Sequence, residues 1–358
     1  MKAEGRPAGI ARSTVICIAE DRVSEEIAVR LCIASSRRSN PECPIIAYLP
    51  RASASLQHWI AAQSLVDLRM KPLQTTHGCT VKPSALLAVL EERFDDVWWI
   101  DTDVLVRRSL TASYGEVDSR IFFATEEALS GDYEDRGHRA RALGLNVVRD
   151  FSFTLNSGVM RVSACHQTLL RRWGELLESP EYRAAQFLDR AGRPRHFTSD
   201  QCVLTGLLCG DEFGDVPVHV LRRGPDIVQY YGPFGYTLRE RLGNIFDGGP
   251  TFIHCQDFKP WRTAYTDEAD PFRSPFKKSY RKLLSETSTY VIEARRFRAD
   301  VADDLPWTQA SSASGNLLRI LGFGNHIMTG LPLAIAGDIT RVIRWIKKAA
   351  QPRSMRRA

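Results

Sequence analysis

The chain has 358 residues, of which 44% are hydrophobic and 25% charged, as is usual for a soluble globular protein with one large α/β domain or two smaller ones. The net charge of +6 comes from the end of the chain, where the residues after position 340 include no acid and seven bases: Arg341, Arg344, Lys347, Lys348, Arg353, Arg356 and Arg357. Residues 1–340 are nearly neutral, which excludes a basic nucleic-acid groove spread across the body.

The apolar and cysteine patterns indicate the compartment. The eight cysteines form no C-x-x-C pair and no zinc-ligand spacing, so we expect no disulfide framework and a reducing cytoplasm. The first apolar run, Thr14–Ala19, is too short for the core of a secretory signal. The sequence also lacks the roughly 18 uninterrupted apolar residues of a membrane span. We therefore expect a cytoplasmic protein.

In the first half, short apolar runs alternate with helical patterns, and this order predicts parallel βα units. Strands are predicted at Thr14–Ala19, 44–49 and 65–70, and a helix begins near Pro83, a residue suited to a first helical turn. The uninterrupted apolar run 97–100 is typical of a strand covered on both faces.

The second half is less regular. Strands are predicted at 121–124, 158–162, 218–221 and 251–255, and residues 130–153 are expected to form a loop or short helices over a site. Ser163 is predicted to cap a helix. Near the end, an apolar stripe at helical spacing predicts an amphipathic helix with Trp345 beside it: Ile335, Ile339, Val342, Ile343 and Ile346. Three residues are expected to interrupt a continuous helix there: Gly330, Pro332 and Gly337.

An acidic pair follows the buried strand 97–100. In an extended chain Asp101 and Asp103 point the same way, toward the carboxyl end of the strand, where ligands bind in open α/β sheets. Two adjacent carboxylates repel each other unless a cation or a proton neutralises them, and their oxygens suit Mg²⁺ or Mn²⁺. Two other interpretations remain open: surface aspartates that end a strand, and a phosphohydrolase with Asp101 as its nucleophile.

Five short motifs follow one another along the chain: Lys82, Asp101-Thr102-Asp103, Asn156-Ser157-Gly158-Val159, Ser199-Asp200-Gln201, and His254 followed by Lys259-Pro260-Trp261. In this order they resemble the GT-A-fold nucleotide-sugar glycosyltransferases, most closely the retaining group that includes glycogenin and bacterial lipopolysaccharide galactosyl- and glucosyltransferases. The resemblance runs from about Thr14 to Trp261. It departs from the family pattern after His254, where the lysine follows at the fifth residue instead of the sixth, so related GT-A families stay open.

The resemblance implies a GT-A (Rossmann-like) fold, a mixed sheet flanked by helices, and a set of donor-binding residues. It implies that Asp101, Asp103 and His254 hold a divalent metal, Mn²⁺ or Mg²⁺, on the diphosphate of a nucleotide sugar, with a UDP-hexose as the expected donor. The other residues that it places around the donor are Glu20 and Asp21 beside the base and ribose, Thr102 within the acidic motif, Lys82 and Lys259 at the phosphates, and Gly158 near the sugar.

The resemblance assigns the chemistry to Asn156, Asp200 and Gln201 beside the reacting sugar. Transfer with retention is expected, and Asp200 is the candidate general base if the enzyme inverts instead. The acceptor is expected to be a glycan or a lipid-linked hydroxyl, and no nucleic acid is expected as a partner. A catalytically idle nucleotide-sugar-binding or membrane scaffold protein is the remaining alternative.

Two domains are predicted: a catalytic domain at 1–281 and a C-terminal amphipathic, basic extension at 282–358. For this extension two interpretations compete. Its apolar stripe either lies on an anionic membrane surface at the cytoplasmic face or packs on the catalytic domain, with the basic face in solvent.

Overall fold

The computed structural model describes residues 13–73, 80–92, 94–127, 137–229, 235–256, 259–262, 282–301, 305–309 and 312–350, with the backbone alone at 344, 345 and 347–350. The chain divides into two compact units. The first contains Met1–Val29, Arg37–Thr102 and Arg108–Leu221, and the second contains Arg30–Ser36, Asp103–Arg107 and Arg222–Ala358. The predicted boundary between 281 and 282 falls within the second unit and stays a prediction.

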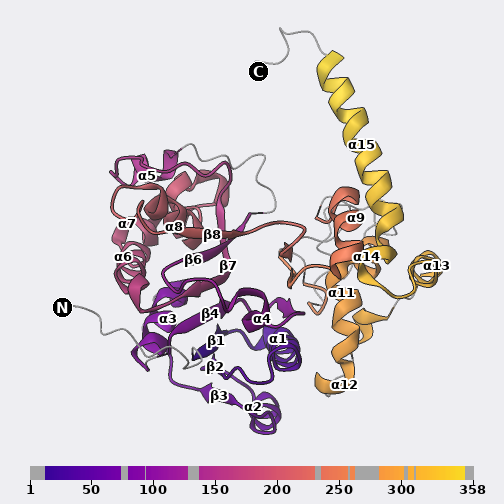
Figure 1. Ribbon diagram of the computed structural model, residues 1–358, viewed down its shortest axis with the longest axis horizontal. Helices are drawn as coiled ribbons and strands as arrows, with labels where there is room; N and C mark the ends of the chain where they lie inside the picture. Colours follow the sequence, from indigo (N-terminus) through magenta and orange to yellow (C-terminus); the bar gives the residue numbers. More distant parts are fainter. Residues whose placement is uncertain are drawn as a thin grey trace. The chain divides into compact units, whose positions relative to one another are not determined.

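The first unit is built on a seven-stranded sheet of order β3-β2-β1-β4-β7-β6-β8 (Figure 1). β1 pairs in parallel with β2 and β4, whereas β7 runs antiparallel to both β4 and β6. The sheet is therefore mixed, which confirms the predicted fold class. Its strands are β1 (Thr14–Ala19), β2 (Ile45–Tyr48), β3 (Val66–Arg69), β4 (Asp96–Ile100), β6 (Phe122–Glu126), β7 (Leu155–Val162) and β8 (Val218–Leu221).

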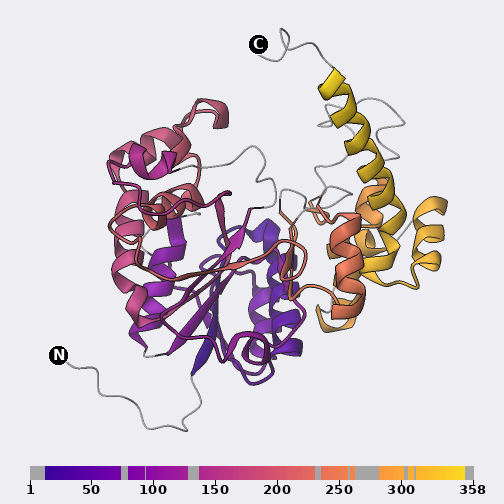
Figure 2. The same ribbon diagram turned by 45° about the horizontal axis from the view of Figure 1, so that its top comes forward.

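Helices cover this sheet. The structure places α1 (Glu26–Ser39), α2 (Ala54–Ala61), α3 (Val81–Glu91), α4 (Leu110–Tyr114), α5 (His138–Ala142), α6 (Gln167–Leu177), α7 (Pro180–Gln186) and α8 (Asp200–Cys209). Helices α3, α6 and α8 contribute their leucines to one buried cluster that also contains Trp99 and Trp173, and they lie along the sheet in both views (Figure 2). Burial of this apolar surface is the main force that holds the unit together.

Short 3-10 turns complete the first unit: η1 (Val23–Glu25), η4 (Ala164–His166), η5 (Arg190–Gly192) and η6 (Arg195–Phe197). Ser163 caps η4 in a capping box with His166, one turn before the helix that it was predicted to begin.

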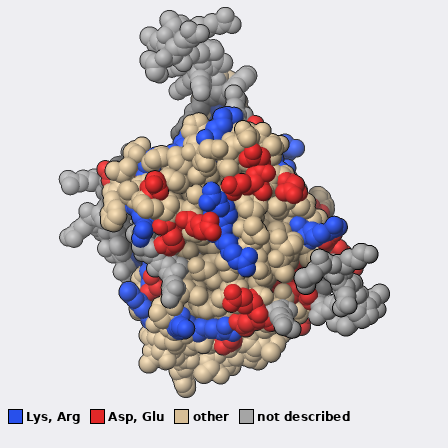
Figure 3. All heavy atoms as spheres, turned by 90° about the vertical axis from the view of Figure 1, so that its left-hand side faces the viewer, with Lys and Arg blue, Asp and Glu red and all other residues tan. Residues whose placement is uncertain are grey.

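On the face drawn in Figure 3, lysines and arginines are interspersed with acidic side chains, so the described residues present mixed charge there.

The motif at 156–158 belongs to a strand that begins three residues before the predicted 158–162. Asn156, Ser157 and Gly158 lie inside strand β7, which begins at Leu155. Asn156 pairs with Thr125 of β6, and the hydroxyl of Thr125 donates a 2.8 Å hydrogen bond to the Asn156 carbonyl. The neighbouring strand therefore keeps the motif extended, although polar residues and glycine favour a turn when they are considered alone.

The second unit contains a three-stranded sheet of order β5-β10-β9, made of Val104–Val106, Phe252–His254 and Ile227–Val228. Its helices are α9 (Leu238–Asp247), α11 (Thr289–Ala294), α12 (Arg298–Val301), α13 (Ala313–Leu321), α14 (His326–Thr329) and α15 (Leu331–Ala350), with 3-10 turns η8 (Arg295–Phe297) and η9 (Pro306–Thr308). Among the described helices, none combines the length and apolar character needed to cross a membrane.

Helix α15 corrects part of the prediction for the C-terminal region. Gly330 ends α14 as expected, but α15 continues for 20 residues through Pro332 and Gly337. Pro332 is the second residue of α15, where a backbone N–H has no intrahelical acceptor to lose. A single internal glycine costs only about 1 kcal/mol, which the rest of the helix offsets.

Candidate functional site

The predicted site residues form two clusters, because Asp101 belongs to the first unit and Asp103 to the second. Asp101 follows β4 directly, and its backbone N–H donates a 2.8 Å hydrogen bond to the carbonyl of Gly158 on β7. Its carboxylate accepts a hydrogen bond of 2.7 Å from the indole of Trp99. The antiparallel pairing of β4 with β7 therefore brings the acidic motif beside the glycine of the 156–158 motif.

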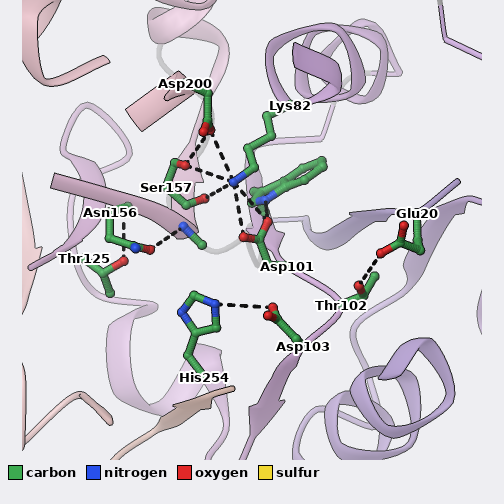
Figure 4. Close-up of polar contacts among 12 residues, drawn as sticks. Glu20, Lys82, Asp101, Thr102, Asp103, Thr125, Asn156, Ser157, Asp200 and His254 are labelled. Carbon is green, nitrogen blue, oxygen red and sulfur yellow. Dashed lines mark hydrogen bonds and ion pairs between the residues drawn. The ribbon is translucent and has the colours of Figure 1, made fainter. Parts of the chain in front are cut away.

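Lys82 lies at the centre of the first cluster (Figure 4). Lys82 is 8% exposed. Its ammonium contacts the carboxylate of Asp101 at 3.1 Å, the hydroxyl and the carbonyl of Ser157 at 2.9 and 3.2 Å, and the carboxylate of Asp200 at 3.4 Å. Ser157 in turn donates a 2.7 Å hydrogen bond to Asp200. A buried ammonium is stable only when it is paired and hydrogen-bonded, and here two carboxylates supply that pairing.

A second group of polar side chains surrounds Glu127, a residue that the sequence interpretation missed. Its carboxylate accepts hydrogen bonds from the side-chain amides of Asn156, at 2.9 Å, and Gln201, at 2.8 Å. A signal was present in the sequence: Glu127 follows the apolar strand β6 as Asp101 follows β4. Both strands run antiparallel to β7, so their carboxyl ends lie at the same edge of the sheet.

The end of β1 carries the predicted base-side residues. Glu20 accepts hydrogen bonds from the guanidinium of Arg22 at 2.8 Å and from the hydroxyl of Thr102 at 3.1 Å. Asp21 is exposed, and its N–H donates to the carboxylate of Glu20. Thr102, between the two aspartates of the acidic motif, is thereby tied to the loop that follows β1.

The second cluster consists of Asp103, His254 and Lys259. His254 ends strand β10, which pairs with β5, and the N–H of Cys255 donates a 2.9 Å hydrogen bond to the Asp103 carbonyl. The His254 Nε2 atom lies 3.3 Å from a carboxylate oxygen of Asp103 (Figure 4), while the ammonium of Lys259 contacts the other oxygen. Burial alone would raise the pKa of Asp103, but His254 and Lys259 lower it overall.

These residues fit a divalent metal. Carboxylate oxygen and neutral imidazole nitrogen are usual ligands for Mn²⁺ and similar ions. Asp103 and His254 offer one of each within the second unit, and Asp101 offers a carboxylate in the first. The Nδ1 atom of His254 is buried without a hydrogen-bond partner among the described residues, so the imidazole retains donor and acceptor capacity that protein contacts leave unused. Each aspartate also contacts a lysine, Asp101 with Lys82 and Asp103 with Lys259.

Aromatic residues anchor the loop that carries Lys259. The Trp261 ring lies 5.8 Å from that of Tyr290 and 6.0 Å from that of Trp307, measured between ring centroids. The Lys259 ammonium lies 5.8 Å from the centre of the Trp261 ring, within the range of a cation–π interaction. The sequence also offers Tyr230 and Tyr231 as aromatic side chains able to stack on a sugar, but both lie outside the described residues.

The chain is similar to several solved structures. It covers 52% of a bifunctional glycosyltransferase, WbbM, with 77% of its own length, 13% identity and a TM-score of 0.49. It covers 95% of the galactosyltransferase LgtC, in complex with donor and acceptor sugar analogs, with 80% of its own length, 15% identity and a TM-score of 0.46. It covers 57% of the glycosyltransferase GlyE of Streptococcus pneumoniae TIGR4 with 70% of its own length, at 16% identity and a TM-score of 0.42.

The chain thus spans about half the length of WbbM. No protein-family model matches the sequence, and no curated protein matches it. All three of these solved structures are glycosyltransferases.

Proposed function

We propose that this chain is a metal-dependent glycosyltransferase that moves a hexose from a nucleotide-diphosphate donor, a UDP-hexose, to a hydroxyl of a glycan or lipid acceptor. The observation that carries the proposal is the cluster of Asp103, His254 and Lys259, which combines two metal-binding side chains with a lysine suited to a diphosphate. Asp101, separated from Asp103 by Thr102 alone, completes the proposed ligand set.

In this proposal Asp101, Asp103 and His254 hold Mn²⁺ or Mg²⁺, which would stabilise the negative charge of the departing nucleoside diphosphate. Lys259 donates hydrogen bonds to the diphosphate, and Lys82 fixes Asp101 and Asp200 relative to each other. Glu20 and Asp21 border the base and ribose. Gly158 lets the backbone of β7 approach the sugar closely, since it has no side chain to block that approach.

The proposed catalytic residues are Asn156, Asp200 and Gln201, at the sugar. Transfer with retention is proposed, with the acceptor hydroxyl attacking on the side of the leaving group. Asp200, held by Ser157 and Lys82, orients the sugar or the acceptor. Nuclear magnetic resonance of the first-formed product tests this stereochemistry: an axial donor linkage should give an axial product linkage, and an equatorial product would contradict retention.

The competing phosphohydrolase mechanism requires Asp101 to attack a phosphate. In the structure its Oδ1 atom accepts from Trp99 and its Oδ2 atom contacts Lys82, at 2.7 and 3.2 Å. An oxygen engaged in this way is a poorer nucleophile, so the geometry favours sugar transfer. Incubation with a panel of UDP-sugars and with a phosphate ester separates the two: transfer releases UDP, whereas phosphohydrolysis releases inorganic phosphate from the ester.

We further propose that α15 lies on an anionic membrane surface, so that the protein is cytoplasmic and peripheral. Its apolar stripe is 41–56% exposed at Ile335, Ile339, Val342, Ile343 and Ile346. The same unit exposes further large apolar side chains, among them Phe246 of α9, Ile320 of α13 and Phe323 in the turn after α13. Together with the basic end of the chain, such a surface suits the headgroup layer of acidic lipid.

Cosedimentation with vesicles tests this membrane proposal. The full chain should bind vesicles with anionic lipid at low salt, less at high salt, and neutral vesicles weakly. The double variant Ile339→Asp/Ile343→Asp should lose most of this binding. Thr340→Asp, on the same helix, adds a negative charge outside the stripe and should lose far less. Equal binding by the double variant and the wild type would contradict a membrane role for the stripe.

A further inference from the structure

Glu127 joins the two side-chain amides that the proposed function places at the sugar. We propose that it is a positioning residue, which fixes the orientation of the carboxamides of Asn156 and Gln201. This inference rests on the proposed function, because its consequence for catalysis depends on Gln201 facing the sugar. The orientation itself follows from contacts within the first unit.

The geometry brings three elements together. Glu127 directly follows β6, is 4% exposed, and its backbone N–H donates a 3.0 Å hydrogen bond to the carbonyl of Thr154. The Oε2 atom of Glu127 accepts from Asn156 Nδ2 on β7 and from Gln201 Nε2 in the first turn of α8. A single carboxylate oxygen therefore links the sheet to the start of the helix.

The chemistry of a carboxylate determines which way the two amides turn. An ionised carboxylate only accepts hydrogen bonds, so each amide must direct its NH₂ group toward Glu127. The Oδ1 atom of Asn156 accepts a 2.8 Å hydrogen bond from the N–H of Gly158. Both the oxygen and the nitrogen of the Asn156 carboxamide are therefore hydrogen-bonded. For Gln201 the same constraint turns the carbonyl oxygen away from Glu127.

This orientation gives Glu127 an indirect role in sugar transfer. A carbonyl oxygen with a fixed direction can stabilise positive charge that develops at the sugar in the transition state. A glutamine at position 127 would both donate and accept, so the carboxamide of Gln201 could then point either way. The expected loss is therefore in turnover, with donor binding much less affected.

The first test reads orientation without any assay of activity. Side-chain amide resonances of Asn and Gln, recorded by NMR on the full chain, should shift at Asn156 and Gln201 in Glu127→Gln. The matched control is Glu126→Gln, the same change on the preceding residue, in which the chemical shifts of these two side-chain amides should stay unchanged. Glu127→Asp keeps the acceptor-only chemistry and provides a second variant should the first fail to fold. Resonances of Asn156 and Gln201 unchanged in both Glu127 variants would overturn the proposal.

The second test is a double-mutant cycle on sugar transfer. Glu127→Gln should lower kcat by about tenfold or more, whereas in a Gln201→Ala background it should have an effect of no more than about twofold, because the side chain that it orients is gone. Equal losses in both backgrounds would overturn the positioning role. If the wild type transfers no sugar, the proposed function fails, and the NMR comparison alone decides whether Glu127 orients the amides.

Discussion

Lys82 has little exposed surface and lies between two carboxylates, Asp101 and Asp200. Without its charge, these two carboxylates would lose their shared partner in a partly buried space. Lysine at this position therefore has a structural role in addition to any contact with a phosphate or a sugar.

Replacement of this charge should be costly. Lys82→Met retains most of the side-chain volume but leaves the carboxylates unpaired, so we expect the free energy of unfolding to fall by about 3 kcal/mol. Urea denaturation followed by circular dichroism measures the change. The control Lys71→Met removes an exposed charge and should stay within about 0.5 kcal/mol of the wild type. Equal stability of the two variants would show that the pairing contributes little.

Asp200 is the first residue of α8, and its carboxylate accepts a hydrogen bond from the hydroxyl of Ser157. Because it is proposed to act at the sugar, Asp200→Ala should lower kcat by at least about 100-fold while UDP affinity, measured by calorimetry, changes by less than about threefold. Asp215→Asn, an exposed change outside the site, serves as control. A loss of UDP affinity as large as the loss of turnover would place Asp200 in the donor pocket or in the fold.

The sequence predicted several of these side chains but not how they are connected. Asp101, Asp200 and Lys82 were all identified by the order of motifs that resembles the glycosyltransferases. Glu127 has no motif around it, and its role depends on the pairing of β6 with β7, a contact between segments about 30 residues apart. Side-chain networks that depend on such register were beyond what spacing alone reveals.

At the level of elements, hydrophobic runs predicted the long, buried strands well. The bounds of β1 and β8 agree with the predicted 14–19 and 218–221. β1 is a mostly apolar run, and β8 has apolar residues at three of its four positions before Arg222. Strands β5 and β9 were missed. They contain three and two residues, too few for a periodicity to appear, and they exist through pairing with β10.

A buried ion cluster connects helices of the second unit. Glu293 on α11 contacts Arg107 at 3.4 Å, Arg296 at 2.7 Å and His326 of α14 at 3.3 Å. Burial alone would raise the pKa of Glu293, but His326, Arg107 and Arg296 lower it to about 2. Its folded pKa is thus below its ordinary value of 4.5, so its ionised form stabilises the folded chain.

This shift predicts a defined loss of stability in acid. The contribution of Glu293 should be complete above pH 4.5 and decline as the pH falls from about 4.5 to about 2. Glu293→Gln should lower the free energy of unfolding by about 3 kcal/mol at pH 7 and flatten this part of the pH profile. The control Glu175→Gln, at an exposed position on α6, should leave both the free energy of unfolding and its pH profile unchanged. A pH profile of Glu293→Gln identical to the wild type would contradict the ion cluster's role.

Over the whole molecule, the fold class was predictable because βα alternation and a central apolar strand are properties of long segments. The order of the five motifs predicted a resemblance to glycosyltransferases, and sugar transfer is the function that we propose. The division into two units was not predictable, because the second unit takes Arg30–Ser36 and Asp103–Arg107 from the first third of the chain. Tertiary contacts, not composition, determine that assignment.

Metal-dependent sugar transfer is the central claim, and release of UDP from a UDP-sugar donor in the presence of an acceptor tests it most directly. The account predicts activity with Mn²⁺ or Mg²⁺, loss of that activity in EDTA, recovery when the metal is restored, and at least about a 100-fold loss in Asp103→Asn, assayed at a temperature where circular dichroism shows the variant to be folded. Asp215→Asn should retain full activity. Undiminished transfer in EDTA, or full transfer by Asp103→Asn, would contradict the account.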